Sequence, residues 1–193
     1  MRIHVIGASG SGTTTLGAAL AARLDLMHVD SDDIYWLPTD PPYRTPRASN
    51  ERAALFFERT RDAPGWVFTG SALRWGGPIE PFYDLVVFLK IDPELRKARL
   101  LRREAERYGA RVEPGGDMAE KTQQFLEWAA SYDTAGLGQR SLVSHEAWLA
   151  TLKCPVLRLD SARAVDALVA EVLAHPAMTD ATTPRAFAAR SAR

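Results

Sequence analysis

Residues 2–24, RIHVIGASGSGTTTLGAALAARL, constrain the fold more than any other stretch of the sequence. The stretch begins with a short β-rich run. It ends with an alanine-rich run whose leucines recur every four residues, as on one face of a helix. Between the two runs lie Gly7, Gly10 and Gly12. A strand that leads through a glycine loop into a helix is the context of phosphate-binding loops, in which backbone N–H groups and the helix N-terminus bind the anion.

The loop departs at one position from the usual phosphate-binding pattern, G-x-x-x-x-G-K-[ST]. Gly7 and Gly12 have the required spacing and Thr14 occupies the position of the metal-binding hydroxyl, but Thr13 replaces the lysine. Because the backbone of such a loop makes most of the phosphate contacts, we still predict phosphate binding. The predicted nucleotide-binding residues are Gly7, Ala8, Ser9, Gly10, Ser11, Gly12, Thr13, Thr14 and Thr15.

Two other interpretations of the glycine loop compete with a nucleotide site. The first is a tight strand-to-helix turn without a ligand, although three glycines and a run of hydroxyl side chains exceed what a turn needs. The second is the dinucleotide-binding turn of short-chain dehydrogenases. Those enzymes normally place a lysine four residues after the catalytic tyrosine, and none of the five tyrosines of this chain has one there. The chain is also short for that fold.

Four further β-rich runs alternate with helical patterns along the rest of the chain. The expected strands cover residues 26–33, 65–70, 84–92 and 154–160, and the expected helices cover about 50–61, 93–109, 118–133, 142–152 and 162–175. Alternation of this kind predicts an α/β fold, a three-layer α/β/α sandwich around a five-stranded parallel sheet with right-handed crossovers. We expect one domain over residues 1–175, with an acceptor-side insert at about 33–64, a helical lid at about 103–147 and a mobile tail at 176–193.

Composition excludes several classes of function. The 193 residues include 24 basic and 24 acidic side chains, so no net charge attracts the chain to nucleic acid or to an anionic membrane. The single Cys154 fits a reducing compartment. No apolar stretch is long enough to span a membrane. These observations predict a cytoplasmic protein without nucleic-acid or membrane partners, and they say nothing of its oligomeric state.

Acidic side chains follow the second predicted strand, at the sheet edge where the glycine loop also lies. Asp30 and Asp32 are two residues apart, so both can face one cleft. Phosphoryl transfer needs hydroxyl and carboxylate oxygens for a magnesium ion and an acid that orients the attacking group. We therefore predict functional roles for Asp30 and Asp32, and interpret Asp33 as a solvated acid near a helix cap.

The order of these parts resembles the adenylate kinase-like family of small P-loop phosphotransferases, and most closely its topology modulation protein branch. The resemblance covers about residues 1–173 and rests on the segments GASGSGTT, DSDDIYWLP, WVFTG, DLVVFLKIDPELRKARLLRR and GGDM. It implies a nucleoside-triphosphate site at the glycine loop, an acceptor site after the second strand and a lid that carries arginines. It also implies that Thr14 and Asp30 hold Mg²⁺ and that Asp32, Arg103, Arg107 and Arg140 are catalytic.

Two positions depart from the family pattern. Thr13 stands in place of the loop lysine, and Thr69 stands where an acid often ends the third strand. We therefore keep two hypotheses: an ATP- and Mg²⁺-dependent phosphotransferase whose lid arginines supply the missing charge, and a nucleotide-binding sensor that has lost catalysis. A DNA-binding role is disfavoured by the neutral charge. Four arginines around the acceptor site hint at an anionic acceptor, and two tryptophans there are the strongest candidates for a role outside the core: Arg44, Arg47, Arg52 and Arg74, with Trp36 and Trp75.

Overall fold

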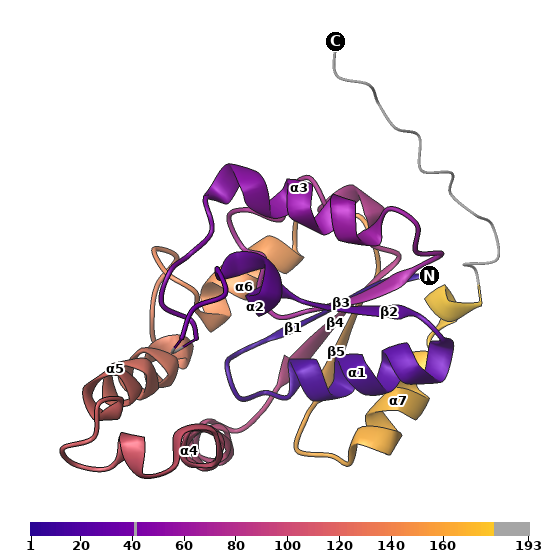
Figure 1. Ribbon diagram of the computed structural model, residues 1–193. Helices are drawn as coiled ribbons and strands as arrows, with labels where there is room; N and C mark the ends of the chain where they lie inside the picture. Colours follow the sequence, from indigo (N-terminus) through magenta and orange to yellow (C-terminus); the bar gives the residue numbers. More distant parts are fainter. Residues whose placement is uncertain (41, 180–193) are drawn as a thin grey trace.

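The computed structural model describes residues 1–40 and 42–179 and contains a five-stranded parallel sheet (Figure 1). The strand order is β2-β3-β1-β4-β5, so the first strand lies at the centre. The strands are β1 (Arg2–Gly7), β2 (Met27–Asp30), β3 (Trp66–Thr69), β4 (Leu85–Lys90) and β5 (Val156–Asp160). The predicted fold class is confirmed, and the carboxyl ends of the strands meet at one edge, where the glycine loop begins.

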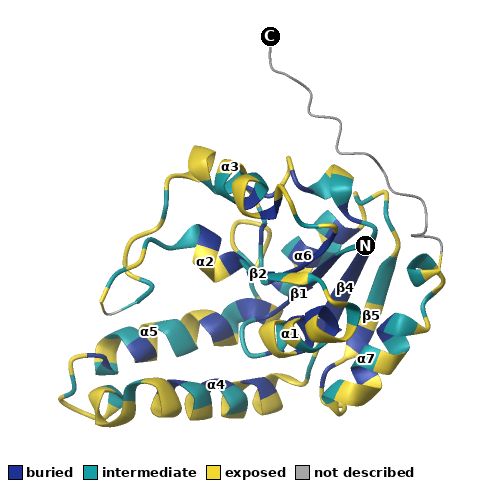
Figure 2. Cartoon of the chain, turned by 45° about the vertical axis from the view of Figure 1, so that its right-hand side comes forward, coloured by how far each residue is buried: buried dark blue, intermediate teal, exposed yellow. Residues whose placement is uncertain are grey.

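Helices cover both faces of the sheet (Figure 1). On one face lie α1 (Thr13–Leu24) and α7 (Val165–Leu173), whose leucines and valines pack on Ile3, Val5 and Val87. On the other face lie α3 (Ser49–Thr60) and α6 (Leu142–Leu149), in an aromatic-rich core that includes Phe56 and Phe68. Figure 2 shows the strands buried between these layers, as expected for a parallel sheet covered on both sides.

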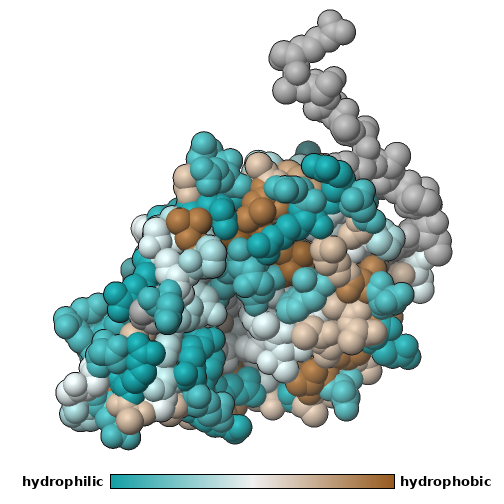
Figure 3. All heavy atoms as spheres, viewed as in Figure 1, coloured by the Kyte–Doolittle hydropathy of each residue, from teal (hydrophilic) through white to brown (hydrophobic). Residues whose placement is uncertain are grey.

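The remaining helices lie beside the carboxyl edge of the sheet. α4 (Pro93–Tyr108) starts at the predicted cap, where Asp92 accepts hydrogen bonds from the N–H groups of Glu94 and Leu95. It is followed by η2 (Gly109–Val112), α5 (Ala119–Ala130) and η3 (Ser131–Asp133). We call residues 93–133 the α4–α5 arm. Figure 3 shows that hydrophilic residues cover much of this arm.

Four short elements were not predicted from the sequence, and η2, directly after α4, is one of them. The second strand stops at Asp30, and residues Ser31–Tyr35 form α2 rather than a strand end, because the Asp30 side chain accepts a hydrogen bond from the Asp32 N–H and caps the turn. η1 (Glu80–Phe82) precedes β4. η4 (Pro176–Met178) begins the predicted tail and packs against the core, whereas residues 180–193 of that tail lie outside the described residues.

A buried arginine fixes the base of the α4–α5 arm. The side chain of Arg96 is 3% exposed, and it binds the carboxylate of Asp133 at 2.6 Å and the carbonyl of Ala129 at 3.2 Å. The guanidinium also lies over the ring of Tyr132, 5.2 Å from its centroid. These contacts orient the arm. Removing Asp133 would leave the buried charge of Arg96 unpaired, so the fold should be sensitive to mutation at this pair.

Replacing Asp133 by alanine is expected to lower the free energy of unfolding by about 3 kcal/mol, because Arg96 then keeps only the Ala129 carbonyl. In a chain of this size the melting temperature then falls by roughly 6–12 °C. Arg102→Ala is the matched control, since it breaks the exposed Arg102–Glu106 pair of the same helix and should change the melting temperature far less. Equal effects of the two variants in thermal unfolding would contradict the role given to Arg96.

Candidate nucleotide and acceptor site

The glycines give the loop a backbone that other residues would strain. Gly10 and Gly12 have φ angles of 84° and 87°, in the left-handed region. A Cβ on Gly7 would lie 2.4 Å from the Ser11 hydroxyl and 2.8 Å from the Leu89 carbonyl. The Ser11 N–H donates to the Ala8 carbonyl at 3.1 Å, so the loop closes on itself. The sequence therefore forms a tight loop that leads directly into α1.

The polar groups of this loop are available to a ligand. Gly12 is the N-cap of α1 and offers no side chain to the first N–H groups of the helix, and the first intrahelical bond is made by the Leu16 N–H. Ser11 is buried, and its hydroxyl has no hydrogen-bond partner in the protein. Unpaired donors at a helix N-terminus form a site for an anion.

Two oxygen ligands of the predicted metal site lie side by side. The Thr14 hydroxyl donates to Asp30 Oδ2 at 2.8 Å, and the other oxygen of that carboxylate binds the Asp32 N–H at 2.9 Å. A hydroxyl beside a carboxylate fits the preference of Mg²⁺ for oxygen ligands, with the remaining positions left to water and phosphate. Within residues 1–40 and 42–179 no three His, Cys, Asp or Glu side chains are grouped to hold a metal, so Thr14 and Asp30 would need oxygens from the ligand.

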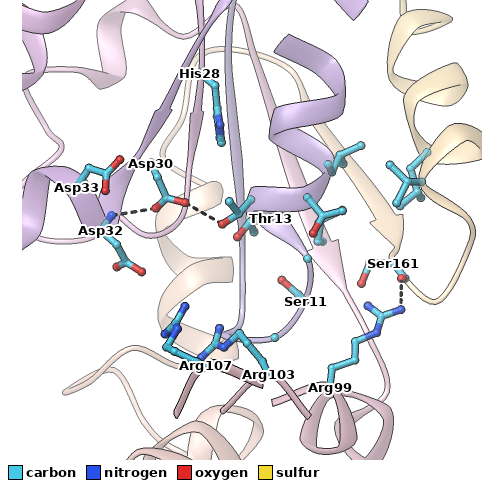
Figure 4. Close-up of a pocket in the computed structure, with 18 of the residues that line it drawn as sticks. Ser11, Thr13, His28, Asp30, Asp32, Asp33, Arg99, Arg103, Arg107 and Ser161 are labelled. Carbon is cyan, nitrogen blue, oxygen red and sulfur yellow. Dashed lines mark hydrogen bonds between the residues drawn. The ribbon is translucent and has the colours of Figure 1, made fainter. Parts of the chain in front are cut away.

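Asp32 faces the arginines of α4, whereas Asp33 points away from them (Figure 4). The Asp32 side chain remains accessible to solvent through the open cleft. Its surroundings nevertheless displace bulk water, and this desolvation together with the charge of Asp30 raises its pKa. The positive charges of Arg140, Arg103 and Arg107 oppose that shift. The structure thus brings the predicted acid and the predicted arginines into one electrostatic group.

A cavity of about 680 Å³ lies along the glycine loop. Asp30, Asp32 and residues 10–16 line one side of it, and four arginines line the other: Arg99, Arg103, Arg107 and Arg163. Neither Arg99 nor Arg163 was predicted from the sequence to belong to the site. Arg99 Nη1 lies 3.9 Å from the position that a Cβ of Gly12 would take, and Arg99 Nη2 donates to the Ser161 carbonyl at 3.0 Å (Figure 4). Arg99 lies four residues before Arg103 on the same face of α4, and this spacing could have indicated from the sequence that Arg99 belongs to the site.

The two predicted arginines of α4 differ in how firmly they are held. Arg103 binds the buried carboxylate of Glu104 at 2.9 Å, so part of its charge is neutralised. Arg107 lies 3.9 Å from the same carboxylate and over the ring of Tyr43, 5.0 Å from its centroid. Arg107 therefore has the less compensated charge of the two.

A second cavity, of about 730 Å³, adjoins the first. It lies between α2, the segment after β3 and the α4–α5 arm, and four residues line both cavities: Asp32, Tyr43, Arg103 and Arg107. Arg140 lines the second cavity, not the first, and its Nη2 donates to the Gly7 carbonyl at 2.7 Å. Trp36, Trp75 and Trp128 also line the second cavity, and Trp128 was not expected there. Two adjoining cavities joined at an acid and two arginines can hold two ligands in contact.

The third strand ends in a hydrogen bond rather than a carboxylate. Thr69 is buried, and its hydroxyl lies 3.0 Å from Nε2 of His28, which lines the first cavity. This hydroxyl–imidazole pair lies beside Asp30, at the position where the family pattern often has an acid. His28 was not assigned to the site from the sequence.

A search of known proteins identifies a related chain. Over 171 residues, which make up 89% of this chain and 94% of the relative, it is 43% identical to the uncharacterized protein YqaC of Bacillus subtilis (strain 168). The chain belongs to the YqaC family. No family model matches it. Membership in the YqaC family relates the two proteins but does not assign an activity to this chain.

Solved structures show that the YqaC-family chain has the fold of small kinases. It matches a shikimate kinase from Bacteroides thetaiotaomicron with a TM-score of 0.53 and 17% identity, over 90% of this chain and 96% of that one. A gluconokinase from Sinorhizobium meliloti 1021 matches with a TM-score of 0.51 and 16% identity, over 90% and 89%. The deoxyadenosine kinase from M. mycoides with bound dATP matches with a TM-score of 0.50 and 11% identity, over 95% of this chain and 100% of that one. In the described part of the YqaC-family chain, no helix is both long and apolar enough to cross a membrane.

Proposed function

We propose that this protein is a phosphotransferase that moves the terminal phosphoryl group of ATP to a small acceptor, as expected for an adenylate kinase-like protein of the topology modulation branch. The observation that carries the proposal is the junction of the two cavities. Asp32, Arg103 and Arg107 line both, so a nucleotide on the glycine loop and an acceptor in the second cavity would meet at these side chains. Positioning and charge stabilisation account for most of the catalysis in such reactions.

The residues have separable roles in this proposal. The loop N–H groups bind the phosphates, and Asp32 orients the acceptor and accepts its proton where the attacking group is a hydroxyl. The bond between the terminal phosphorus and its bridging oxygen breaks, a bond to the acceptor oxygen forms, and ADP leaves. Arg103 and Arg107 balance the charge of the transferring group. A Mg²⁺ ion held by Thr14 and Asp30 would supply further charge neutralisation to the outer phosphates.

A second candidate is a sensor that binds a nucleotide without turning it over. Thr13 and Thr69 favour it, since they stand where a lysine and an acid serve the magnesium–phosphate complex in the family that the sequence resembles. Release of ADP from Mg-ATP, measured with and without a panel of nucleotide, sugar and small-acid acceptors, separates the candidates. Acceptor-dependent release supports the phosphotransferase, and nucleotide binding with no release under any acceptor supports the sensor.

Binding of Mg-ATP to the glycine loop is expected to stabilise the fold. At a concentration about a hundred times the dissociation constant, a ligand of the native state adds about 2.7 kcal/mol, which is a rise of roughly 5–10 °C in melting temperature for a chain of this size. Gly12→Ala should remove most of this rise, because Gly12 has a φ angle of 87° that strains an alanine, and because the added Cβ would enter the cavity that the phosphates occupy.

Gly77→Ala provides the control for that measurement. A Cβ on Gly77 meets no atom within 4 Å, and Gly77 has no positive φ angle. This variant should keep the full ATP-dependent rise. The assignment of the glycine loop is wrong if the wild-type protein shows no shift with ATP, GTP or ADP at millimolar concentration, or if both variants respond alike.

A further inference from the structure

The second cavity has aromatic walls from two separate parts of the chain. Trp36 and Tyr43, both in the segment that follows α2, are in edge contact with ring centroids 6.2 Å apart. Phe125 and Trp128, on α5, are tilted against each other with centroids 6.0 Å apart. Trp128 lines the cavity and is 38% exposed. The rings offer flat apolar surface to a small ligand.

Each aromatic wall also carries guanidinium groups. Three arginines of the cavity lie over its rings, at distances between guanidinium carbon and ring centroid of 5.0 Å for Arg107 on Tyr43, 5.4 Å for Arg103 on Phe125 and 5.7 Å for Arg140 on Trp128. Cation–π contacts of this kind restrict the orientation of the guanidinium. Nε of Arg140 is buried without a hydrogen-bond partner. The rings therefore place several oriented cationic donors around one space.

The charge of the cavity is strongly positive. Five cationic residues line it against two acids: Arg74, Arg103, Arg107, Lys121 and Arg140 against Asp32 and Glu104. The Lys121 ammonium group donates to the Tyr43 carbonyl at 3.2 Å, which is a neutral partner rather than a carboxylate. Burial and the nearby charge of Arg44 lower its pKa. An anionic group on the ligand would compensate this charge.

Backbone strain is concentrated at the same cavity. Among the described residues, three other than glycine have positive φ angles, and two of them, Tyr43 at 62° and Arg74 at 73°, line it. The third, Asp25, ends α1. The Arg74 guanidinium reaches across to the carbonyl of Gly138, in the segment that follows the arm. Strain of this kind persists where the surrounding structure enforces a functional geometry.

We infer that the second cavity binds a planar aromatic ring that carries a negatively charged group, the chemical class to which nucleoside monophosphates belong. The ring would lie against the walls of Trp36 and Tyr43 and of Phe125 and Trp128, with its anion among the arginines and Lys121. Calling this ligand the acceptor rests on the proposed function. An acyclic sugar acid would satisfy the charge but leave the aromatic walls without a flat partner.

A matched set of probes separates the contribution of the aromatic ring from that of the negative charge. Thymidine 5′-monophosphate carries both the ring and the anion, thymidine lacks the anion, 2-deoxyribose 5-phosphate lacks the ring, and gluconate is an anionic polyol. Dissociation constants are measured by calorimetry on the full chain without ATP. We expect thymidine 5′-monophosphate to bind at least about tenfold more tightly than each of the other three, since base–aromatic stacking and a charge-assisted hydrogen bond each contribute on that scale.

Variants locate the binding in the second cavity rather than on the glycine loop. Trp128→Leu should weaken thymidine 5′-monophosphate about tenfold and Trp128→Phe much less, because phenylalanine keeps a ring for stacking. Lys121→Met should weaken the monophosphate but not thymidine. Lys97→Met is the matched control, since Lys97 is exposed on α4 and lines neither cavity. Gly12→Ala should leave this binding unchanged.

The outcomes of this experiment are distinct from those of the proposed function. Monophosphate binding that depends on Trp128 and Lys121 supports the inference even if no ADP is ever released, in which case the proposed function fails alone. Equal or tighter binding of gluconate or 2-deoxyribose 5-phosphate overturns the inference, and so does monophosphate binding that is lost in Gly12→Ala but kept in Trp128→Leu. Transfer of phosphate to a ring-free acceptor overturns it while the phosphotransferase stands.

Discussion

Replacing Arg107 by alanine is expected to lower the turnover number of phosphoryl transfer by about 10³-fold, within the range attributed to an arginine that stabilises this kind of transition state. The loop has Thr13 in place of lysine, so backbone N–H groups and one Mg²⁺ would leave part of the phosphate charge unmatched. Arg107 lines both cavities, and its nearest carboxylate, on Glu104, is 3.9 Å away. Arg103→Ala should have a smaller effect, because Glu104 already pairs with Arg103 at 2.9 Å.

Rescue experiments test whether Arg107 supplies the charge that the loop lacks. Arg107→Lys should recover only part of the activity, because the two-pronged guanidinium is lost. Thr13→Lys should recover more activity in the Arg107→Ala background than it adds to the wild-type protein, which is a non-additive effect in a double-mutant cycle. Arg102→Ala, on the exposed side of the same helix, is the control. Normal turnover in both the Arg107→Ala and the Arg103→Ala variants would exclude compensation from α4.

Asp32→Asn should reduce the turnover number by about 10²- to 10⁴-fold with a hydroxyl acceptor, the usual contribution of a positioned acid or base. The amide keeps the shape of the side chain but cannot accept the proton, and it removes the negative charge that faces the arginines. ATP affinity should change little, since the loop N–H groups are untouched. Steady-state kinetics with both substrates varied, together with ATP binding, measures the two effects separately.

Asp33→Asn is the matched control for that substitution. Asp33 is the next residue of α2 and carries the same carboxylate; it also lines the first cavity, but it is exposed and points away from the arginines (Figure 4). Its replacement should leave the turnover number within about twofold of the wild type, as for a solvated surface acid. Equal turnover in Asp32→Asn and Asp33→Asn would show that Asp32, like Asp33, is a solvated acid without a catalytic role.

The fold could be predicted because its signals are local. The glycines of the loop, the apolar runs of the strands and the Asp92 cap each specify a conformation from a few neighbouring residues, and the structure confirms the five strands and their layers. α2 was missed because its single turn depends on where the Asp30 side chain points after the strand ends. The strand order depends on contacts between distant segments, such as the pairing of β1 with β3 and β4.

The site could be predicted only where a residue has a fixed place in the loop or at a strand end. Thr14 and Asp30 are in hydrogen-bond contact, which agrees with the shared cleft expected from their positions. Arg99, His28 and Trp128 were missed because their side chains reach the cavities from helix faces or a strand whose orientation depends on tertiary packing. The contact of Arg140 with the Gly7 carbonyl joins residues 133 positions apart, and no local pattern encodes it.

If the two cavities bind a nucleotide and an acceptor as proposed, their shared lining predicts that the two ligands bind cooperatively. Asp32, Tyr43, Arg103 and Arg107 belong to both, so a ligand that fixes these side chains in one cavity also changes the free energy of binding in the other. Such coupling is reciprocal: the factor by which the acceptor changes nucleotide affinity equals the factor by which the nucleotide changes acceptor affinity. A loop lysine would hold the nucleotide independently of the acceptor. With threonine in its place, the proposed reaction would have the order and synergy of substrate addition controlled by α4 and not by the loop.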